Sequence, residues 1–174
     1  MDVPPAFISF EKLMKATIKV VNPKKIVEWG PGFSTDIFLT SGAEIFSWEN
    51  SGSWFAFYDK KFKDNENVHI YFGDTAQGMG RKTPYINAPL QMFELGSIDI
   101  CFVDGRFRAD CFLMAKHLIS DNGVVMLHDI YRSPLEPLRN NYYQFRFEDK
   151  ENKTGVYTKN QDIINKIKKA YEEI

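Results

Sequence analysis

The chain has 174 residues, of which 44% are hydrophobic and 26% charged, the length and balance of one globular domain spanning residues 1–174. A formal net charge of −1 gives no general attraction to nucleic acid or to an anionic membrane, so neither is expected as a partner. The opening Met-Asp-Val-Pro-Pro lacks the basic and apolar regions of a signal peptide, and no apolar run approaches the ~20 residues of a membrane span, so we expect a cytoplasmic protein.

Helix and strand patterns alternate along the first three quarters of the chain. Residues 1–22 contain a helix, because apolar residues from Phe7 to Val21 recur at helical spacing and Asn22-Pro23 ends the pattern. Ser34 and Thr35 are placed to cap the next helix. Cys101 and Cys111 are too few for a disulfide framework or a metal cluster and are expected to be buried, reduced thiols. The predicted strands are 26–29, 45–49, 68–72, 98–103 and 124–127, and the predicted helices between them are 34–40, 53–62 and 107–120.

Two regions depart from this alternation. Residues 75–95 contain two glycines and two prolines and show no clean helical period, so we predict a loop with room for one short helix. Residues 75–96 are therefore a candidate substrate loop. After a helix predicted at 131–140, strands at 143–147 and 155–158 flank a polar connection and form a hairpin, and a helix at 161–174 ends the chain. The sequence therefore predicts an α/β fold with a doubly wound, mostly parallel sheet and a C-terminal antiparallel hairpin.

A glycine turn follows the first predicted strand and opens a helix. Its sequence is Glu28-Trp29-Gly30-Pro31-Gly32-Phe33-Ser34-Thr35. Glycine lets the backbone approach a ligand closely, and the amides at the start of a helix suit a carboxylate or a phosphate. A tight turn that serves packing alone is the alternative interpretation.

Two carboxylates follow the next strands. Glu49 lies 19 positions after Gly30, where α/β folds that bind nucleotides place an acid that accepts hydrogen bonds from ribose hydroxyls. Asp74 ends the third strand, where it is either a turn former or a contact of adenine. These features fit a dinucleotide or S-adenosylmethionine. The dinucleotide motif needs a third small residue at the position that Thr35 occupies, which favours S-adenosylmethionine.

The motifs together resemble class I S-adenosylmethionine-dependent methyltransferases, which have a Rossmann-like fold. The resemblance covers residues 20–160 and rests on the glycine turn, Glu49, and the strand ends Val103-Asp104-Gly105 and Leu127-His128-Asp129. These two strand ends are similar to those of small-molecule and sugar O-methyltransferases, some of which use a metal. The resemblance implies that the cofactor contacts Glu28, Gly30, Gly32, Ser34, Glu49, Asp74, Thr75 and Asp104.

The acceptor side is predicted from two strand ends. Asp104 and Asp129 end neighbouring parallel strands, so their carboxylates should emerge side by side and share a proton, bind a cation such as Mg²⁺, or pair with Arg106 or Arg108. His128 or Asp129 is a candidate base for a hydroxyl acceptor. Alternation along the strand predicts that His128 points away from Asp129, the metal hypothesis lacks an obvious third ligand, and a structural role for His128 stays open.

Candidate contacts of the acceptor are Arg81 and Tyr85 in the loop, Arg106, and Tyr131. We therefore expect methyl transfer to a small molecule, at oxygen, with Asp104, His128 and Asp129 as the catalytic residues. A nicotinamide- or nucleotide-binding enzyme and a non-catalytic S-adenosylmethionine-binding module are the alternatives. Because little sequence lies outside the core fold, a partner subunit in a homo-oligomer is expected to complete the open site.

Overall fold

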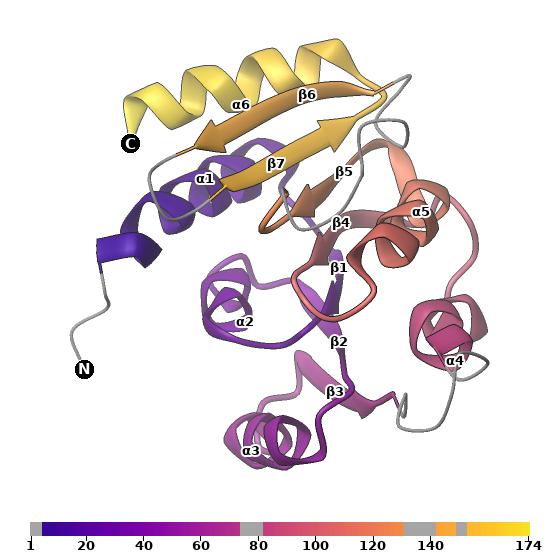
Figure 1. Ribbon diagram of the computed structural model, residues 1–174. Helices are drawn as coiled ribbons and strands as arrows, with labels where there is room; N and C mark the ends of the chain where they lie inside the picture. Colours follow the sequence, from indigo (N-terminus) through magenta and orange to yellow (C-terminus); the bar gives the residue numbers. More distant parts are fainter. Residues whose placement is uncertain (1–4, 74–81, 131–141, 149–152) are drawn as a thin grey trace.

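A single seven-stranded sheet organises the computed structural model, which describes residues 5–73, 82–130, 142–148 and 153–174 (Figure 1). The strand order is β3-β2-β1-β4-β5-β7-β6. Strands β1 to β5 are parallel, β7 is antiparallel to β5, and β6 is antiparallel to β7. This confirms the predicted doubly wound sheet with its C-terminal hairpin. The strands are β1 (Lys25–Trp29), β2 (Glu44–Glu49), β3 (Val68–Phe72), β4 (Ile98–Val103), β5 (Ile119–Leu127), β6 (Tyr143–Glu148) and β7 (Lys153–Thr158).

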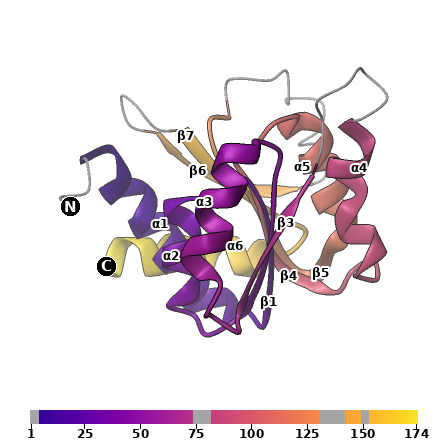
Figure 2. The ribbon, with the colours of Figure 1, turned by 90° about the horizontal axis from the view of Figure 1, so that it is seen from below.

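Helices cover both faces of the sheet, and Figure 2 shows them on its two sides. One face carries α1 (Pro5–Val21), α2 (Phe33–Leu39), α3 (Gly52–Phe62) and α6 (Gln161–Glu173). The other face carries α4 (Lys82–Asn87), the 3-10 helix η2 (Ala88–Gln91) and α5 (Arg108–Leu118). No helix within these described segments has both the length and the apolar character needed to cross a bilayer.

Burial on both faces explains the continuous apolar runs of the central strands. In β4, Ile100 and Phe102 belong to the core beneath α1 and α2, whereas Cys101 and Val103 belong to the core beneath α5. Cys101 and Cys111 are buried free thiols, which confirms their predicted packing role.

Two predicted boundaries were wrong. Helix α5 ends at Leu118 rather than at residue 120, and the Asp-Asn-Gly sequence that was expected to stop it lies inside β5. Gly123 suits that strand because a Cβ there would lie 2.8 Å from the carbonyl oxygen of Ile98. Residues 82–91 form two short helices, since Pro84 and Pro89 each lie near the start of one, where proline is tolerated. The helix predicted at 131–140 lies outside the described residues.

The register of the parallel strands brings the residues after each strand level with one another. Trp29 pairs with Trp48 of β2 and with Val103 of β4, and Val103 pairs with Leu127 of β5. The next residues are Gly30, Glu49, Asp104 and His128, which therefore lie in one row along the carboxyl edge of the sheet. This is the edge at which open α/β sheets bind ligands.

Candidate functional site

A pocket of about 1130 Å³ lies over this row. Its walls come from the loops that follow β1, β2, β4 and β5 and from α1 and α3. The predicted site residues among its lining are Gly30, Gly32, Ser34, Glu49, Asp104, Arg106 and His128. Four further predicted residues, Asp74, Thr75, Arg81 and Tyr131, lie outside the described part of the chain.

The glycine turn and the loop after β4 touch backbone to backbone. The carbonyl oxygen of Trp29 accepts hydrogen bonds from the amides of Asp104 (3.0 Å) and Gly105 (2.7 Å). Gly30 has φ +92°, and a Cβ on it would lie 2.8 Å from the nitrogen of Gly105. Position 30 therefore requires glycine, because its φ is positive and because a side chain would collide with the Gly105 backbone.

Glu28 is buried behind the turn, with none of its surface exposed, and does not line the pocket. Its carboxylate accepts hydrogen bonds from the hydroxyls of Ser34, Thr35 (2.7 Å) and Ser47 (2.6 Å). Burial raises the pKa of Glu28 to about 7, against the lowering effect of the three hydroxyls. The structure thus gives Glu28 a place under the turn rather than the expected place beside the cofactor.

The helix after the turn is capped differently from the prediction. Gly32 is the N-cap of α2, and its amide donates to the Thr35 hydroxyl at 3.1 Å. The Ser34 hydroxyl donates to Glu28 instead of capping the helix, because Glu28 lies on the face of β1 that α2 covers. Ser34 still lines the pocket, but its hydroxyl is engaged behind it.

Glu49 fixes the start of the next loop. One of its carboxylate oxygens accepts hydrogen bonds from the amides of Asn50 and Ser51, both at 2.7 Å, and the side chain lines the pocket. Trp54 and Tyr58 of α3 line the same wall and stack with ring centroids 5.7 Å apart. Sequence reasoning missed both aromatic residues, because aromatic residues in a helix otherwise indicate core packing.

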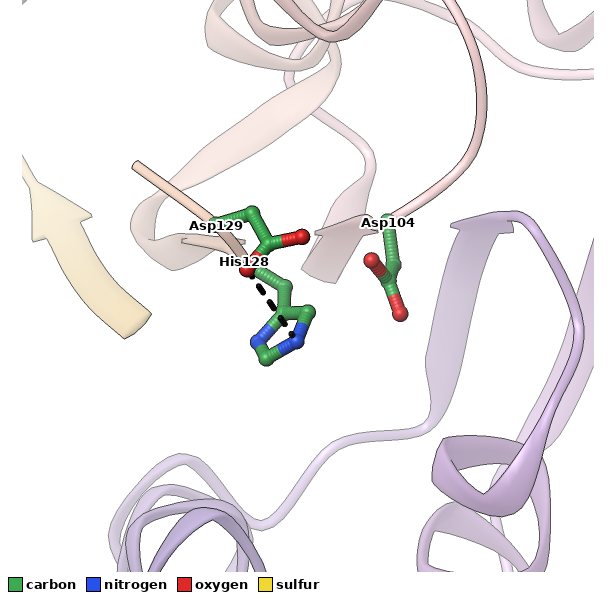
Figure 3. A group of neighbouring side chains, drawn as sticks. All are labelled: Asp104, His128 and Asp129. Atoms are coloured by element: carbon green, nitrogen blue, oxygen red, sulfur yellow. Dashed lines mark ion pairs between the residues drawn. The ribbon is translucent and has the colours of Figure 1, made fainter. Parts of the chain in front are cut away.

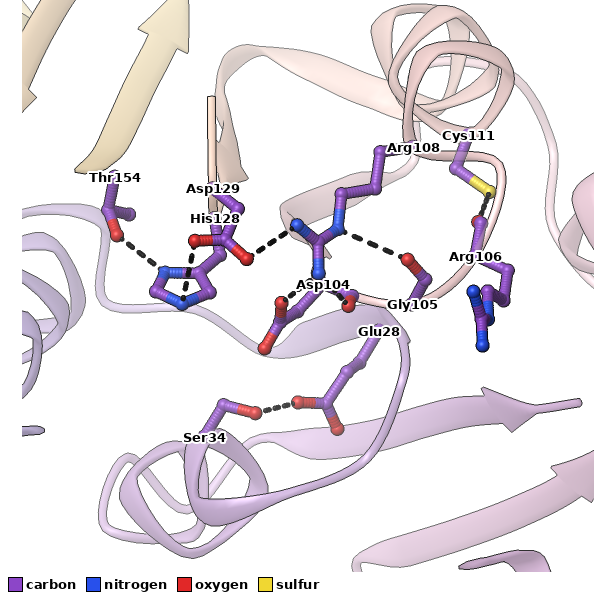
Figure 4. Close-up of polar contacts among 10 residues, drawn as sticks. All are labelled: Glu28, Ser34, Asp104, Gly105, Arg106, Arg108, Cys111, His128, Asp129 and Thr154. Atoms are coloured by element: carbon purple, nitrogen blue, oxygen red, sulfur yellow. Dashed lines mark hydrogen bonds and ion pairs between the residues drawn. The ribbon is translucent and has the colours of Figure 1, made fainter. Parts of the chain in front are cut away.

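The carboxylates of Asp104 and Asp129 lie on either side of Arg108 (Figure 4). Arg108 donates from Nη2 to Asp104 Oδ1 and from Nη1 to Asp129 Oδ2, each at 2.9 Å. It also donates to the carbonyl oxygens of Asp104 (2.8 Å) and Gly105 (3.1 Å). Of the three predicted ways to hold the two carboxylates together, the structure shows pairing with Arg108.

The Asp104 carboxyl is also electrostatically perturbed. Burial raises its pKa to about 6, although His128 and Arg108 act in the opposite direction. The neighbouring Asp129 and the buried Glu28 add to the increase. The pKa of Asp104 therefore lies closer to neutral pH than that of an ordinary aspartate.

His128 lies beside the two carboxylates rather than away from them (Figure 3). Its Nε2 is 3.8 Å from Asp129 Oδ1, and ligand atoms of Asp104, His128 and Asp129 lie within 4.8 Å of one another. The alternation argument was wrong because β5 ends at Leu127 and Asp129 has φ +52°, which turns its side chain back toward His128. The third potential metal ligand that the sequence did not reveal is thus His128.

Two contacts of His128 come from distant parts of the chain. Its Nδ1 is 2.9 Å from the Thr154 hydroxyl on β7, and its ring packs 4.9 Å from that of Phe10 on α1. Neither residue could be predicted as part of the site. The sequence contains no signal that the C-terminal hairpin pairs with β5 in the register that brings Thr154 beside His128.

Tyr85 is not part of the pocket lining but packs behind Gly105, which is. Its side chain is fully buried, and its backbone carbonyl accepts a hydrogen bond from the Trp29 indole at 3.2 Å. A Cβ on Gly105 would collide with the Tyr85 hydroxyl, so this ring fills the space that the glycine leaves. Tyr85 therefore has a supporting place instead of the expected contact with an acceptor.

Comparisons with known proteins identify the fold. No protein-family model matches the sequence, and no curated protein matches it. A methyltransferase from Geobacter sulfurreducens superposes with a TM-score of 0.63 at 14% identity over 85% of this chain and 77% of its own. A methyltransferase-like protein from Silicibacter pomeroyi gives 0.63 at 17% identity over 98% and 96%. Spermidine synthase from Thermotoga maritima gives 0.62 at 14% identity over 96% and 64%.

These likenesses establish a class I methyltransferase-like fold. The strand order, with the antiparallel β7 inserted between β5 and β6, agrees with that class. Because one of these structures is a spermidine synthase, the fold by itself leaves the transferred group open.

The close approach of Gly30 to Gly105 predicts that a methyl group added at residue 30 strongly lowers the free energy of unfolding. Gly42 is a matched control, because it also has a positive φ (+74°) but a Cβ there would meet nothing within 4 Å. We expect Gly42→Ala to lower the free energy of unfolding by about 1–2 kcal/mol from backbone strain. Gly30→Ala should lower it by about 2–5 kcal/mol, because the Gly105 backbone must also move. Urea denaturation measures both, and equal losses would contradict the proposed contact.

The raised pKa of Glu28 predicts a pH-dependent stability. Between pH 4.5 and about 7 the folded protein retains a proton that the unfolded chain releases, so unfolding free energy falls as the pH rises through this range. Relative to Glu28→Gln, the wild type should lose up to roughly 3 kcal/mol between pH 4.5 and 8. Urea denaturation at several pH values tests this, with the exposed Glu44→Gln as control. Parallel profiles for wild type and Glu28→Gln would refute it.

Proposed function

We propose that this protein is an S-adenosylmethionine-dependent methyltransferase that acts on a small-molecule acceptor, at an oxygen atom. The observation that carries the proposal is that one pocket joins a glycine turn and Glu49 at one side to Asp104, Arg108 and His128 at the other. Asp129 is outside the lining and is bonded to Arg108. Its volume of about 1130 Å³ exceeds that of most single-ligand sites and accommodates a donor together with a small acceptor.

The cofactor half of the pocket supports S-adenosylmethionine. Gly30 and Gly32 leave backbone open to the methionine part of the donor, and Glu49 lies at the end of β2, where it would accept hydrogen bonds from the ribose hydroxyls. Thr35 stands where a dinucleotide site needs a small residue, and its side chain is fully buried and bonded to Glu28. These contacts favour S-adenosylmethionine over a nicotinamide dinucleotide.

The acceptor half supports transfer to a hydroxyl group. The acceptor oxygen forms a bond to the methyl carbon, while the carbon–sulfur bond breaks and its electron pair stays on sulfur, which leaves S-adenosylhomocysteine. Alignment of the two reactants accounts for most of the acceleration, because the sulfonium is a good leaving group. The hydroxyl proton must also be removed.

His128 is the base that we assign to this proton. When His128 Nδ1 carries hydrogen and donates to Thr154, Nε2 has a free lone pair to accept the acceptor's proton. Asp129 Oδ1, 3.8 Å from Nε2, would stabilise the imidazolium that forms. Arg108 engages Asp104 and Asp129, so these carboxylates serve to position and to balance charge in this mechanism.

Calorimetric titration with S-adenosylhomocysteine tests the cofactor site. We expect micromolar binding by the wild type and none of NAD⁺. Glu49→Ala should weaken binding by about 10- to 100-fold, because it removes hydrogen bonds to a charged group. Glu44→Ala, at the opposite end of the same strand, is the control and should bind like the wild type. Binding of NAD⁺ in preference to S-adenosylhomocysteine would overturn the proposal.

A panel of hydroxyl- and amine-bearing small molecules, assayed by formation of S-adenosylhomocysteine, tests the acceptor half. With the most reactive hydroxyl compound, His128→Asn should reduce the transfer rate by about 10²- to 10⁴-fold without changing the Kd of S-adenosylhomocysteine. His69→Asn, outside the pocket, should leave the rate unchanged. An unchanged rate in His128→Asn would remove His128 as the base. Transfer to amines alone would contradict the oxygen assignment, and binding without any transfer would indicate a non-catalytic module.

A further inference from the structure

The O-methyltransferase resemblance implies a divalent metal as one option for this site, so the fit of the residues to Mg²⁺ matters. Mg²⁺ is held octahedrally by oxygen ligands and usually keeps several waters. Here Asp104 and Asp129 supply carboxylates, but the third nearby ligand is the imidazole of His128, a ligand more typical of zinc and other transition metals. The donor set therefore does not match that of a dedicated magnesium site.

A cation already lies between the two carboxylates. The Arg108 guanidinium bonds one oxygen of each carboxylate at 2.9 Å and two backbone carbonyl oxygens at 2.8 and 3.1 Å. Its side chain is only 14% exposed. The planar guanidinium thus joins the loop after β4 to the loop after β5 through four hydrogen bonds (Figure 4).

We infer that Arg108 takes the place of a divalent metal at this site, holds the Asp104 and Asp129 carboxylates together, and makes the site metal-independent. Arg108 bonds one oxygen of each carboxylate, so a metal on the remaining oxygens would lie beside a guanidinium that keeps its charge at every accessible pH, and the two positive charges would repel each other. A metal that took the oxygens bonded to Arg108 would instead leave this guanidinium, only 14% exposed, without its two carboxylate acceptors, which is costly.

Arg108 is therefore a positioning residue. It holds the two carboxylates beside His128 through the hydrogen bonds to Asp104 and Asp129. If the proposed function holds, His128 takes the proton of the acceptor, and the residues of this site carry out the proton transfer themselves. The exclusion of a divalent metal by Arg108 does not depend on which group the protein transfers.

Manganese binding tests the inference without a methyl donor. The free Mn²⁺ signal in electron paramagnetic resonance is recorded during titration of the full chain, for wild type, Arg108→Met and Arg106→Met. Arg106→Met is the matched control: it removes the same charge two residues away, and Figure 4 shows its side chain with no bond to either carboxylate. We expect no binding by wild type or Arg106→Met below 1 mM Mn²⁺, and at least tenfold tighter binding by Arg108→Met, which gains a site at Asp104, His128 and Asp129.

Two results would overturn the inference. One is saturable Mn²⁺ binding by the wild type that is lost in Asp104→Asn, and this test does not require any Arg108 variant to fold. The other is an Arg108→Met protein that still binds S-adenosylhomocysteine but gains no affinity for Mn²⁺. Failure of the proposed function would appear separately, as a wild type that excludes Mn²⁺ and binds no S-adenosylhomocysteine.

Discussion

The carbonyl group of Trp29 is the point on which the site depends. It ends β1 and accepts the amides of both Asp104 and Gly105, which ties the glycine turn to the loop that follows β4. Such an approach is possible only between two residues without side chains, and Gly30 and Gly105 provide them. The buried Tyr85 of α4 packs against Gly105. A helix on the sheet face opposite α2 therefore helps to position the loop after β4, which lines the pocket.

Behind the glycine turn lies a second polar cluster, whose carboxylate does not line the pocket. Glu28 and three hydroxyls lie inside the core between β1, β2 and α2, and each hydroxyl donates to the carboxylate. The cluster fixes the start of α2, and through Thr35 it also holds the amide of Gly32. A buried polar group is stable only when its hydrogen bonds are made. These hydrogen bonds therefore hold the glycine turn next to the cluster in one conformation.

The fold was predictable because its signals are local and repeated. Apolar runs bounded by Gly, Pro and Asp give the strands, and the polar connection before Thr154 gives the hairpin. The row formed by Gly30, Glu49 and Asp104 follows from parallel strands of similar length. What failed depends on tertiary contacts. The φ of Asp129, the burial of Tyr85 and Glu28, and the pairing of Thr154 with His128 each require knowledge of which elements pack together.

The antiparallel placement of β7 links the C-terminal hairpin to the orientation of His128. Every described element that shapes the cofactor side of the pocket precedes residue 110, and His128 follows soon after. Thr154, whose hydroxyl lies 2.9 Å from the His128 ring, is on β7, which follows all five parallel strands in the sequence. The pairing of β7 with β5 therefore does more than complete the sheet, because without it the His128 ring loses the hydrogen bond at Nδ1 even where the glycine turn and the loop after β4 are in place.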